Sequence, residues 1–257
     1  MSYSDLLPAV VSAAEQAGST LLKYYSPNSR PTDRKAMYEV GMQAEAASLA
    51  VVKSALEGVA PTVGWFDDEA DRPVPPGEWW IVDGAEGAVN LVHGLPEFGV
   101  VIVLIRDGEP QLAVARQPIG DLTYVAVRGE GAFVNGERLR VSAKQDLDAA
   151  IVAASQAGNS PETHERFGAR WAALADRALL VRNTIPTTFP LLALASGQYD
   201  AFFQYEPDLP GAAAGTLLAT EAGGVATDLA GDPWRPASTD VLVAAPGVYQ
   251  AVLEVLS

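Results

Sequence analysis

The hydrophobic pattern of this 257-residue chain changes its period twice, and this order of periods is the strongest constraint on its fold. Apolar residues recur at helical spacing in two early segments, 6–25 and 42–56. Short strands separated by turns follow at 98–105, 111–117, 122–128 and 132–139, the last a hairpin with Asn135-Gly136 at its turn. Helices first, then a meander, then alternating strands and helices predict a layered α/β or α+β sandwich.

The second half of the chain alternates short apolar runs with helical patterns. We expect strands at 150–154, 179–182, 201–205 and 241–244. We expect helices at 161–175, up to Ser196, over 211–222 and after 244. One earlier strand, 62–66, should run into the acidic stretch Asp67-Asp68-Glu69.

The chain shows no Pro/Gly/Ser-rich linker that would separate two domains. We therefore expect an N-terminal α+β half, 1–145, that carries the acidic loop and a C-terminal α/β half, 146–257. The two halves should pack closely as one folding unit.

The balance of charge limits the partners of this protein. The chain carries 32 Asp and Glu against 17 Lys and Arg, a formal net charge of −15, and its basic residues are scattered. Such a surface repels nucleic acid and anionic lipid, so we expect neither nucleic acid nor membrane as a partner. No apolar run is long enough to cross a bilayer, and the first residues lack the pattern of a signal peptide. We therefore expect a cytoplasmic protein.

Acidic residues gather at three places where the chain leaves a strand or enters a helix: Asp67-Asp68-Glu69, the pair Asp83 and Glu86, and the pair Glu206 and Asp208. With no cysteine and two histidines, a metal here would have oxygen ligands, which favours Mg²⁺ or Mn²⁺ over zinc. Two such ions can orient a water and neutralise a phosphate. The alternative is that these acids are solvated or cap turns and helices.

Several segments resemble one family in order along nearly the whole chain. WWIVDGAEGAVNLVHGLPEFGVVIVL (79–104) is similar to the pattern W-x-x-D-P-[IL]-D-G-T-x-N-F-x-H-G-x-P. GERLRVS, LALASGQYDAFFQ and AAAGTLLATEAGG match further blocks. These are motifs of the inositol monophosphatase family, within the wider group that includes fructose bisphosphatases and bisphosphate nucleotidases.

The resemblance implies a fold and an activity. The fold is a layered αβαβα sandwich of the sugar-phosphatase type, with mixed sheets and helices between and outside them. The activity is Mg²⁺-dependent hydrolysis of a phosphate monoester, with a small phosphorylated metabolite (a sugar, polyol or nucleotide phosphate) as substrate. A homodimer is implied in the same way.

The resemblance also assigns residues to a metal site. Asp67 aligns with a metal-binding glutamate, Asp83 with the first aspartate of the motif, and Glu86 with the second. Ala85 is placed to offer its backbone carbonyl. Asp67, Asp83 and Glu86 are thus the candidate catalytic residues, and together with Ala85 they are the candidate ligands of Mg²⁺ or Mn²⁺.

The chain departs from the family pattern at other functional positions. Ala88 replaces a threonine that helps to orient the attacking water, and Gly211 stands where the family has a metal-binding aspartate. Asp208, three residues earlier, would substitute only if the loop were rerouted. Residues 38–44 lack the two acids of their block. Thr187 lies in the aligned pocket segment, and Gln204 replaces a substrate-binding glutamate.

These departures leave three functions open. The first is a phosphatase with a rearranged site, in which Gly87, Ala88, Thr187, Gln204 and Asp208 contact the substrate. The second is an enzyme that catalyses elimination, isomerisation or cyclisation of a phosphorylated or diphosphorylated metabolite. The third is a catalytically inactive binding module. The site could hold two, one or no Mg²⁺ or Mn²⁺ ions under these alternatives.

Overall fold

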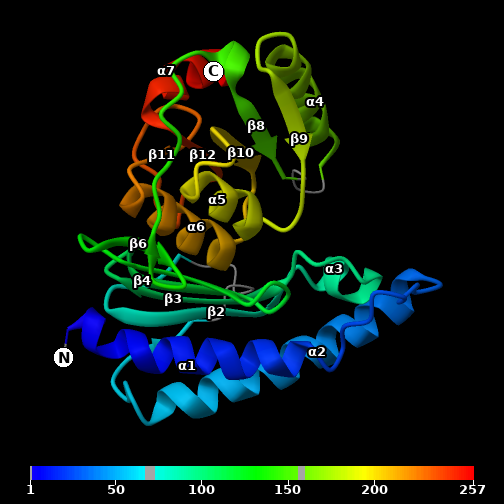
Figure 1. Ribbon diagram of the computed structural model, residues 1–257, viewed down its shortest axis with the longest axis vertical. Helices are drawn as coiled ribbons and strands as arrows, with labels where there is room; N and C mark the ends of the chain where they lie inside the picture. Colours follow the sequence, from blue (N-terminus) through cyan, green and yellow to red (C-terminus); the bar gives the residue numbers. More distant parts are fainter. Residues whose placement is uncertain (1, 67–72, 156–159) are drawn as a thin grey trace.

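Two long helices form one outer layer of the molecule (Figure 1). The structure is a computed structural model that describes residues 2–66, 73–155 and 160–257. Helices α1 (Tyr3–Leu21) and α2 (Arg34–Glu57) pack together and bury their apolar faces against the first sheet. The predicted start of α2 at residue 42 is wrong, because Asp33 caps the helix by accepting a hydrogen bond from the Ala36 N–H at 2.9 Å.

The first sheet packs against these helices and contains seven strands in sequence order. They are β1 (Gly64–Trp65), β2 (Glu78–Glu86), β3 (Gly99–Arg106), β4 (Glu109–Gln117), β5 (Leu122–Val127), β6 (Gly131–Val134) and β7 (Glu137–Arg138). The pairs are antiparallel except that β1 runs parallel to β2. Asn135 and Gly136 both have positive φ, as the predicted hairpin turn requires.

The second sheet has the strand order β11-β12-β10-β8-β9. Its strands are β8 (Ile151–Ala154), β9 (Leu180–Asn183), β10 (Ala201–Tyr205), β11 (Val225–Thr227) and β12 (Asp240–Ala244). Strand β10 is parallel to β8 and antiparallel to β12, so the sheet is mixed. The bounds of β10 are those predicted, whereas β11 was not predicted.

Helices fill the space between the sheets and cover the far side of the second one (Figure 1). The inner pair is α5 (Thr188–Ala195) and α6 (Leu209–Glu221), and α6 is buried on all sides from Pro210 to Ala219 because a sheet lies on either side of it. The outer pair is α4 (Pro161–Ala175) and α7 (Pro246–Leu256). A short helix, α3 (Ala88–His93), extends from the end of β2, and a 3-10 turn (Leu147–Ala149) precedes β8.

These five layers confirm the expected αβαβα sandwich with mixed sheets. Strands β1–β7 fall within 1–145 and β8–β12 within 146–257. The core between the sheets is shared, with Val103 of β3 and Phe202 of β10 in one cluster. That the two halves fold as a single unit stays a prediction. In the described ranges, no helix has the length and apolar character needed to cross a membrane.

Candidate active site

A bulge at the end of β2 presents the two acids of the motif. Asp83 pairs with Val101 and Glu86 with Gly99, so β2 uses one residue more than β3 over this interval. In a regular strand, residues three apart point to opposite faces. The extra residue cancels that alternation and brings both carboxylates to the side of α5 and the cavity described below.

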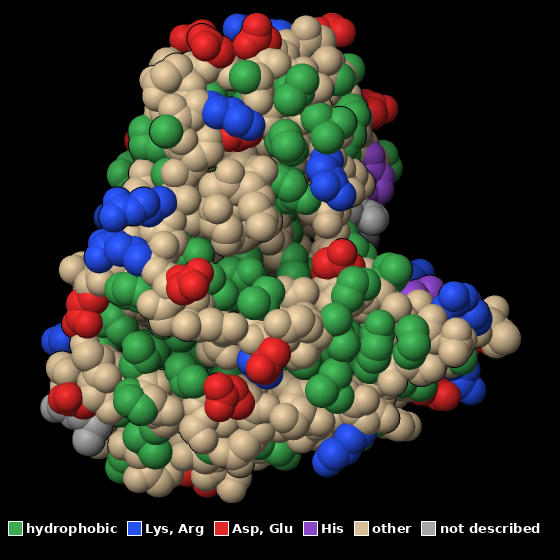
Figure 2. Space-filling view, in the orientation of Figure 1, with side chains coloured by type: hydrophobic (Ala, Val, Ile, Leu, Met, Phe, Trp, Pro, Cys, Tyr) green, Lys and Arg blue, Asp and Glu red, His purple; other side chains and the backbone are tan. Residues whose placement is uncertain are grey.

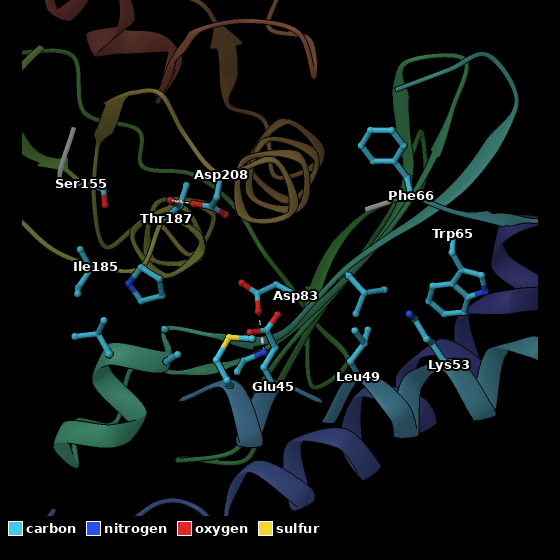
Figure 3. A pocket seen from close by; sticks show the side chains of 17 residues that line it. Glu45, Leu49, Lys53, Trp65, Phe66, Asp83, Ser155, Ile185, Thr187 and Asp208 are labelled. Carbon is cyan, nitrogen blue, oxygen red and sulfur yellow. Dashed lines mark hydrogen bonds between the residues drawn. The ribbon is translucent and has the colours of Figure 1, made fainter. Parts of the chain in front are cut away.

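Gly84, inside this bulge, lets α2 come close. A Cβ on Gly84 would lie 2.9 Å from the carbonyl oxygen of Glu45 and 3.0 Å from the backbone nitrogen of Leu49. Glu45 and Leu49 therefore line the same cavity as Asp83 (Figure 3). Glu45 was not predicted as a site residue, because the family block with which the chain was aligned covers residues 38–44 and ends one residue earlier.

The hydrogen bonds of the two motif acids agree with the cap hypothesis for Asp83 and differ from it for Glu86. Asp83 accepts a hydrogen bond from the Ala85 N–H at 2.7 Å and so closes its own turn. Glu86, which is 2% exposed, accepts one from the Thr188 N–H at 2.9 Å. Glu86 thus caps α5, which lies about 100 residues further along the chain, and not α3. Helix α3 begins at Gly87, in a left-handed conformation and with no side-chain cap.

Asp208 reaches the same region from the start of α6. One carboxylate oxygen accepts a hydrogen bond from the Gly211 N–H at 2.9 Å, and the other accepts one from the Thr187 hydroxyl. A Cβ on Gly211 would lie well under 3.0 Å from that first oxygen, so the carboxylate takes the space beside residue 211 that a side chain there would need. The loop is not rerouted: Asp208 caps α6 and folds back over its first turn.

Burial and neighbouring charges raise the pKa of the two motif carboxylates. Burial raises the pKa of Asp83 to about 7, and the charges of Asp208 and Glu45 add to this, whereas its contacts with Glu86 and the Ala85 N–H oppose it. Burial, followed by the charges of Asp208 and Asp83, raises the pKa of Glu86 well above its usual value. Among the described residues, no Lys or Arg is a cause of either shift, so the pair favours a bound proton or cation.

Burial also raises the pKa of Asp208, against the opposing hydrogen bonds from Thr187 and Gly211. Many protein atoms surround this carboxylate, yet the residue as a whole is exposed. Solvent weakens such a shift, so Asp208 is better described as an accessible acid at the edge of the site than as a buried one.

The acids open into a cavity of about 860 Å³ between α2, the end of β2 and the start of α5 (Figure 3). Of the predicted site residues, six line it: Asp83, Ala85, Gly87, Ala88, Thr187 and Asp208. Glu86 is buried beside Asp83 and is not a lining residue. Gln204 is 5% exposed on β10 and is not among the described lining residues. Asp67 lies outside the described residues.

Two retained motif residues order the loop around α3. The Asn90 side-chain amide donates to the carbonyl oxygens of Glu97 at 2.7 Å and Ile185 at 2.9 Å. A hydrogen bond of 2.7 Å joins His93 Nδ1 and the Val89 carbonyl oxygen. Both side chains therefore bind backbone carbonyl groups and order this loop. Five large hydrophobic side chains of α2 and of the segment around α3 are exposed: Tyr38, Val40, Met42, Val89 and Leu95. Figure 2 shows hydrophobic side chains gathered in this part of the molecule.

The donor atoms of the site fit Mg²⁺ or Mn²⁺ in chemistry, because Asp83, Glu86 and the Ala85 carbonyl offer only oxygen. Within the described part of the chain, the buried Thr188 hydroxyl has no hydrogen-bond partner, and it lies 2.9 Å from where a Gly211 Cβ would be, beside Asp208. An unpaired buried oxygen at this point is a place for a ligand or water. Across the described ranges, no three or more His, Cys, Asp or Glu side chains form a ready ligand set.

Comparison with known proteins gives a full-length match. The model of the inositol monophosphatase family matches residues 2–256. An inositol-1-monophosphatase of Rhizobium meliloti is 30% identical over 234 residues, which cover 90% of this chain and 88% of that protein. A protein named Nus factor SuhB, of Escherichia coli, is 28% identical over 255 residues and covers 96% of this chain and 94% of its own.

Solved structures show the same fold. The inositol monophosphatase of Anabaena (Nostoc) sp. PCC 7120 has a TM-score of 0.86 at 23% identity, covering 99% of this chain and 96% of that one. The extragenic suppressor protein suhB of Bartonella henselae has a TM-score of 0.85 at 24% identity, covering 98% and 99%. These likenesses extend over both sheets and all the helix layers described above.

Proposed function

Because the chain belongs to the inositol monophosphatase family, we propose that it hydrolyses a phosphate monoester of a small metabolite at an altered metal site. The sugar, polyol and nucleotide phosphates are the substrate classes that the resemblance suggests. The observation that carries the proposal is the position of Asp83, in β2, and Asp208, at the start of α6, on the wall of one cavity, with Glu86 buried beside Asp83.

Asp83, Glu86 and the Ala85 carbonyl would hold one Mg²⁺ or Mn²⁺, with Asp67 as a further ligand. When bound, such an ion neutralises charge on the phosphate and lowers the pKa of a bound water. The Ala85 N–H and Thr188 N–H already orient the two carboxylates. A cation bound by these carboxylates would offset the burial and the neighbouring charges that raise the pKa of both acids.

Asp208 would take the part of the aspartate that the family has at position 211. Support comes from the place of its carboxylate, which lies beside residue 211 although it comes from three residues earlier. A second ion is therefore compatible with this chain, with Asp208 as its ligand. If Asp208 serves only to cap α6, a single ion is expected.

Orientation of a water needs a group other than Ala88, which has no hydroxyl. Thr187 and Asp208 form a hydroxyl–carboxylate pair on the cavity wall. Such a pair can hold a water and accept its proton. We include Thr187 and Asp208 in the proposed machinery for this reason, together with Gly87, Ala88 and Gln204 as the substrate contacts that the sequence predicted.

Two alternatives keep the same cavity. One is a non-hydrolytic enzyme that eliminates, isomerises or cyclises a phosphorylated or diphosphorylated substrate, and the other is an inactive binding module. The relatives named Nus factor show that family membership does not by itself fix the partners. The net charge of −15 supports the absence of a nucleic-acid partner, and a homodimer in the cytoplasm completes the proposal.

The test combines binding and turnover. Calorimetric titration of Mn²⁺ into the full chain, into Asp83→Asn and into Asp148→Asn separates a site from surface charge, because Asp148 is an exposed acid in the 3-10 turn. We expect saturable binding in the full chain and in Asp148→Asn, and none in Asp83→Asn. Phosphate release from sugar, polyol and nucleotide monophosphates should likewise occur with the full chain and with Asp148→Asn and be absent with Asp83→Asn.

Mn²⁺ binding without phosphate release would favour the non-hydrolytic enzyme. Equal, weak binding in all three proteins, together with no release, would reject a metal-dependent reaction and leave the binding module.

A further inference from the structure

The cavity continues beyond the acids along one face of α2. Glu45, Leu49 and Lys53 are spaced four residues apart, so they form one stripe of that helix, and all three line the cavity. Glu45 lies at the Asp83 end, and Lys53 lies two turns further on, roughly 12 Å along the helix axis. Figure 3 shows the same order, with Lys53 and Trp65 on the side of Asp83 away from Thr187 and Asp208.

Lys53 gives this far end a positive charge. It is the one Lys or Arg among the described lining residues, in a cavity that also contains Glu45, Asp83 and Asp208. Its ammonium lies 5.7 Å from the centre of the Trp65 ring. No acid in the described ranges lies within ion-pair distance of it. Among the described residues, the Lys53 ammonium therefore contacts an aromatic ring and pairs with no acid, which favours an anion as its ligand.

The wall between the two charged ends is apolar. Leu49 and the half-buried Trp65 line it, together with Phe66 and Val82. At about 860 Å³ the cavity is of a size that takes a whole small-molecule ligand and not only a phosphate group.

We propose that Lys53 and Trp65 form a second subsite, which binds an anionic group of the substrate remote from the phosphate at Asp83. The preferred substrates would then carry two anionic groups joined by a ring or short apolar segment that packs on Leu49 and Trp65. The second group is a phosphate or a carboxylate, since either suits a lysine ammonium. This inference rests on the proposed function, because it takes the acidic end as the site of the first phosphate.

The test measures a ratio of affinities in the full-length protein with Mn²⁺ present. Calorimetry compares a six-carbon polyol bisphosphate, the matching phosphate–carboxylate compound and the matching monophosphate. The proteins are the wild type, Lys53→Met, Lys53→Arg and Lys35→Met. Lys35 is the matched control, because it is a lysine at the start of α2 with an 84% exposed side chain that pairs with Glu39 and does not line the cavity.

We expect the wild type to prefer the doubly anionic ligands by about two- to fivefold, which is the contribution of an exposed ion pair. Lys53→Met should lose this preference, whereas Lys53→Arg and Lys35→Met should keep it. The preference should also shrink as salt is raised from 0.05 to 0.5 M, because exposed charges are screened (estimates of about 14 and 4 Å for the screening length). If the bisphosphate alone is preferred, the second group is a phosphate.

Two results would overturn the subsite: no preference in the wild type, or the same preference in Lys53→Met. Failure of the proposed function gives a different pattern. If no phosphate is released from any ligand but the preference still depends on Lys53, the subsite stands and hydrolysis does not. If release depends on Asp83 while Lys53→Met binds all ligands as the wild type does, hydrolysis stands and the subsite does not.

Discussion

The carboxylate of Asp208 lies in the space that a side chain on residue 211 would need. The Gly211 N–H donates to Asp208 Oδ2 at 2.9 Å, and a Cβ on Gly211 would come well under 3.0 Å from that oxygen. The position of the Asp208 carboxylate therefore depends on residue 211 being a glycine. The missing acid at 211 is not simply lost, because another carboxylate stands beside that position.

The first prediction concerns Gly211→Ala. The added methyl group must displace Asp208 and also meets the Thr188 hydroxyl at 2.9 Å, so we expect a loss of about 1–3 kcal/mol in the free energy of unfolding. Gly168→Ala is the matched control, because Gly168 also lies within a helix, α4, and its Cβ would meet nothing within 4 Å. That change should stabilise by about 0.5–1 kcal/mol. Urea unfolding measures both, and equal effects would contradict the packing described.

The second prediction separates the charge of Asp208 from its role as a helix cap. Asparagine caps helices about as well as aspartate, so Asp208→Asn should keep its stability within about 0.5 kcal/mol, whereas Asp208→Ala should lose about 1 kcal/mol. If Asp208 also helps to hold a cation, both variants should weaken Mn²⁺ binding by about tenfold or more. Calorimetry and urea unfolding on the same samples decide this. If Asp208→Asn binds Mn²⁺ with the affinity of the wild type, Asp208 acts only as the cap of α6.

Much of the fold was predictable because its signals are local. Helix α4 has the predicted bounds, since Ser160 caps it and Pro161 occupies its first turn. Strand β10 is an uninterrupted apolar run that is buried throughout. The start of α2 was missed because residues 34–41 are largely exposed there and show little apolar periodicity. Strand β11 has three residues, which is too short for a pattern.

The site was predictable only in part, because its contacts join distant segments. Asp83 and Glu86 could be named from the motif, but the α5 partner of Glu86 is a tertiary contact. Glu45 enters the cavity because Gly84 admits α2, and no spacing along the chain shows that. Gln204 was predicted to contact the substrate because it lies in a matching block, but it is not among the described residues that line the cavity.

The third prediction is the pH dependence of the metal-free protein. The pKa of Asp83 is raised from 3.8 to about 7, so the folded chain holds this proton more tightly than the unfolded chain does. The contribution of Asp83 to stability therefore falls as pH rises from about 4 to about 7 and is level above that. Asp83→Asn has no such group, so its melting temperature relative to the wild type should rise across this window.

Saturating Mn²⁺ gives the control for this measurement. A bound cation keeps Asp83 ionised, so the wild type should lose the fall in stability between pH 5 and 7, while Asp83→Asn should be unaffected. A constant difference in melting temperature between the two metal-free proteins would show that Asp83 titrates as an ordinary acid.

The fourth prediction concerns the contact of α2 with the β2 bulge. A methyl group on Gly84 would meet the Glu45 carbonyl oxygen at 2.9 Å and the Leu49 nitrogen at 3.0 Å, and these are backbone atoms of a helix that cannot move singly. Gly84→Ala should therefore push α2 away, with a loss of about 1–3 kcal/mol in the free energy of unfolding. Gly58→Ala, at the end of α2 and free of contacts, should change stability by less than about 0.5 kcal/mol.

The same displacement should be visible in the electrostatics of the site. The charge of Glu45 contributes to the raised pKa of Asp83, so moving α2 outward should lower that pKa toward its ordinary value. In the metal-free protein, the fall in stability with rising pH should then be smaller in Gly84→Ala than in the wild type and unchanged in Gly58→Ala. Should Gly84→Ala be as stable as the wild type, with the same pH dependence, the close approach of α2 would have no part in placing Glu45 beside Asp83.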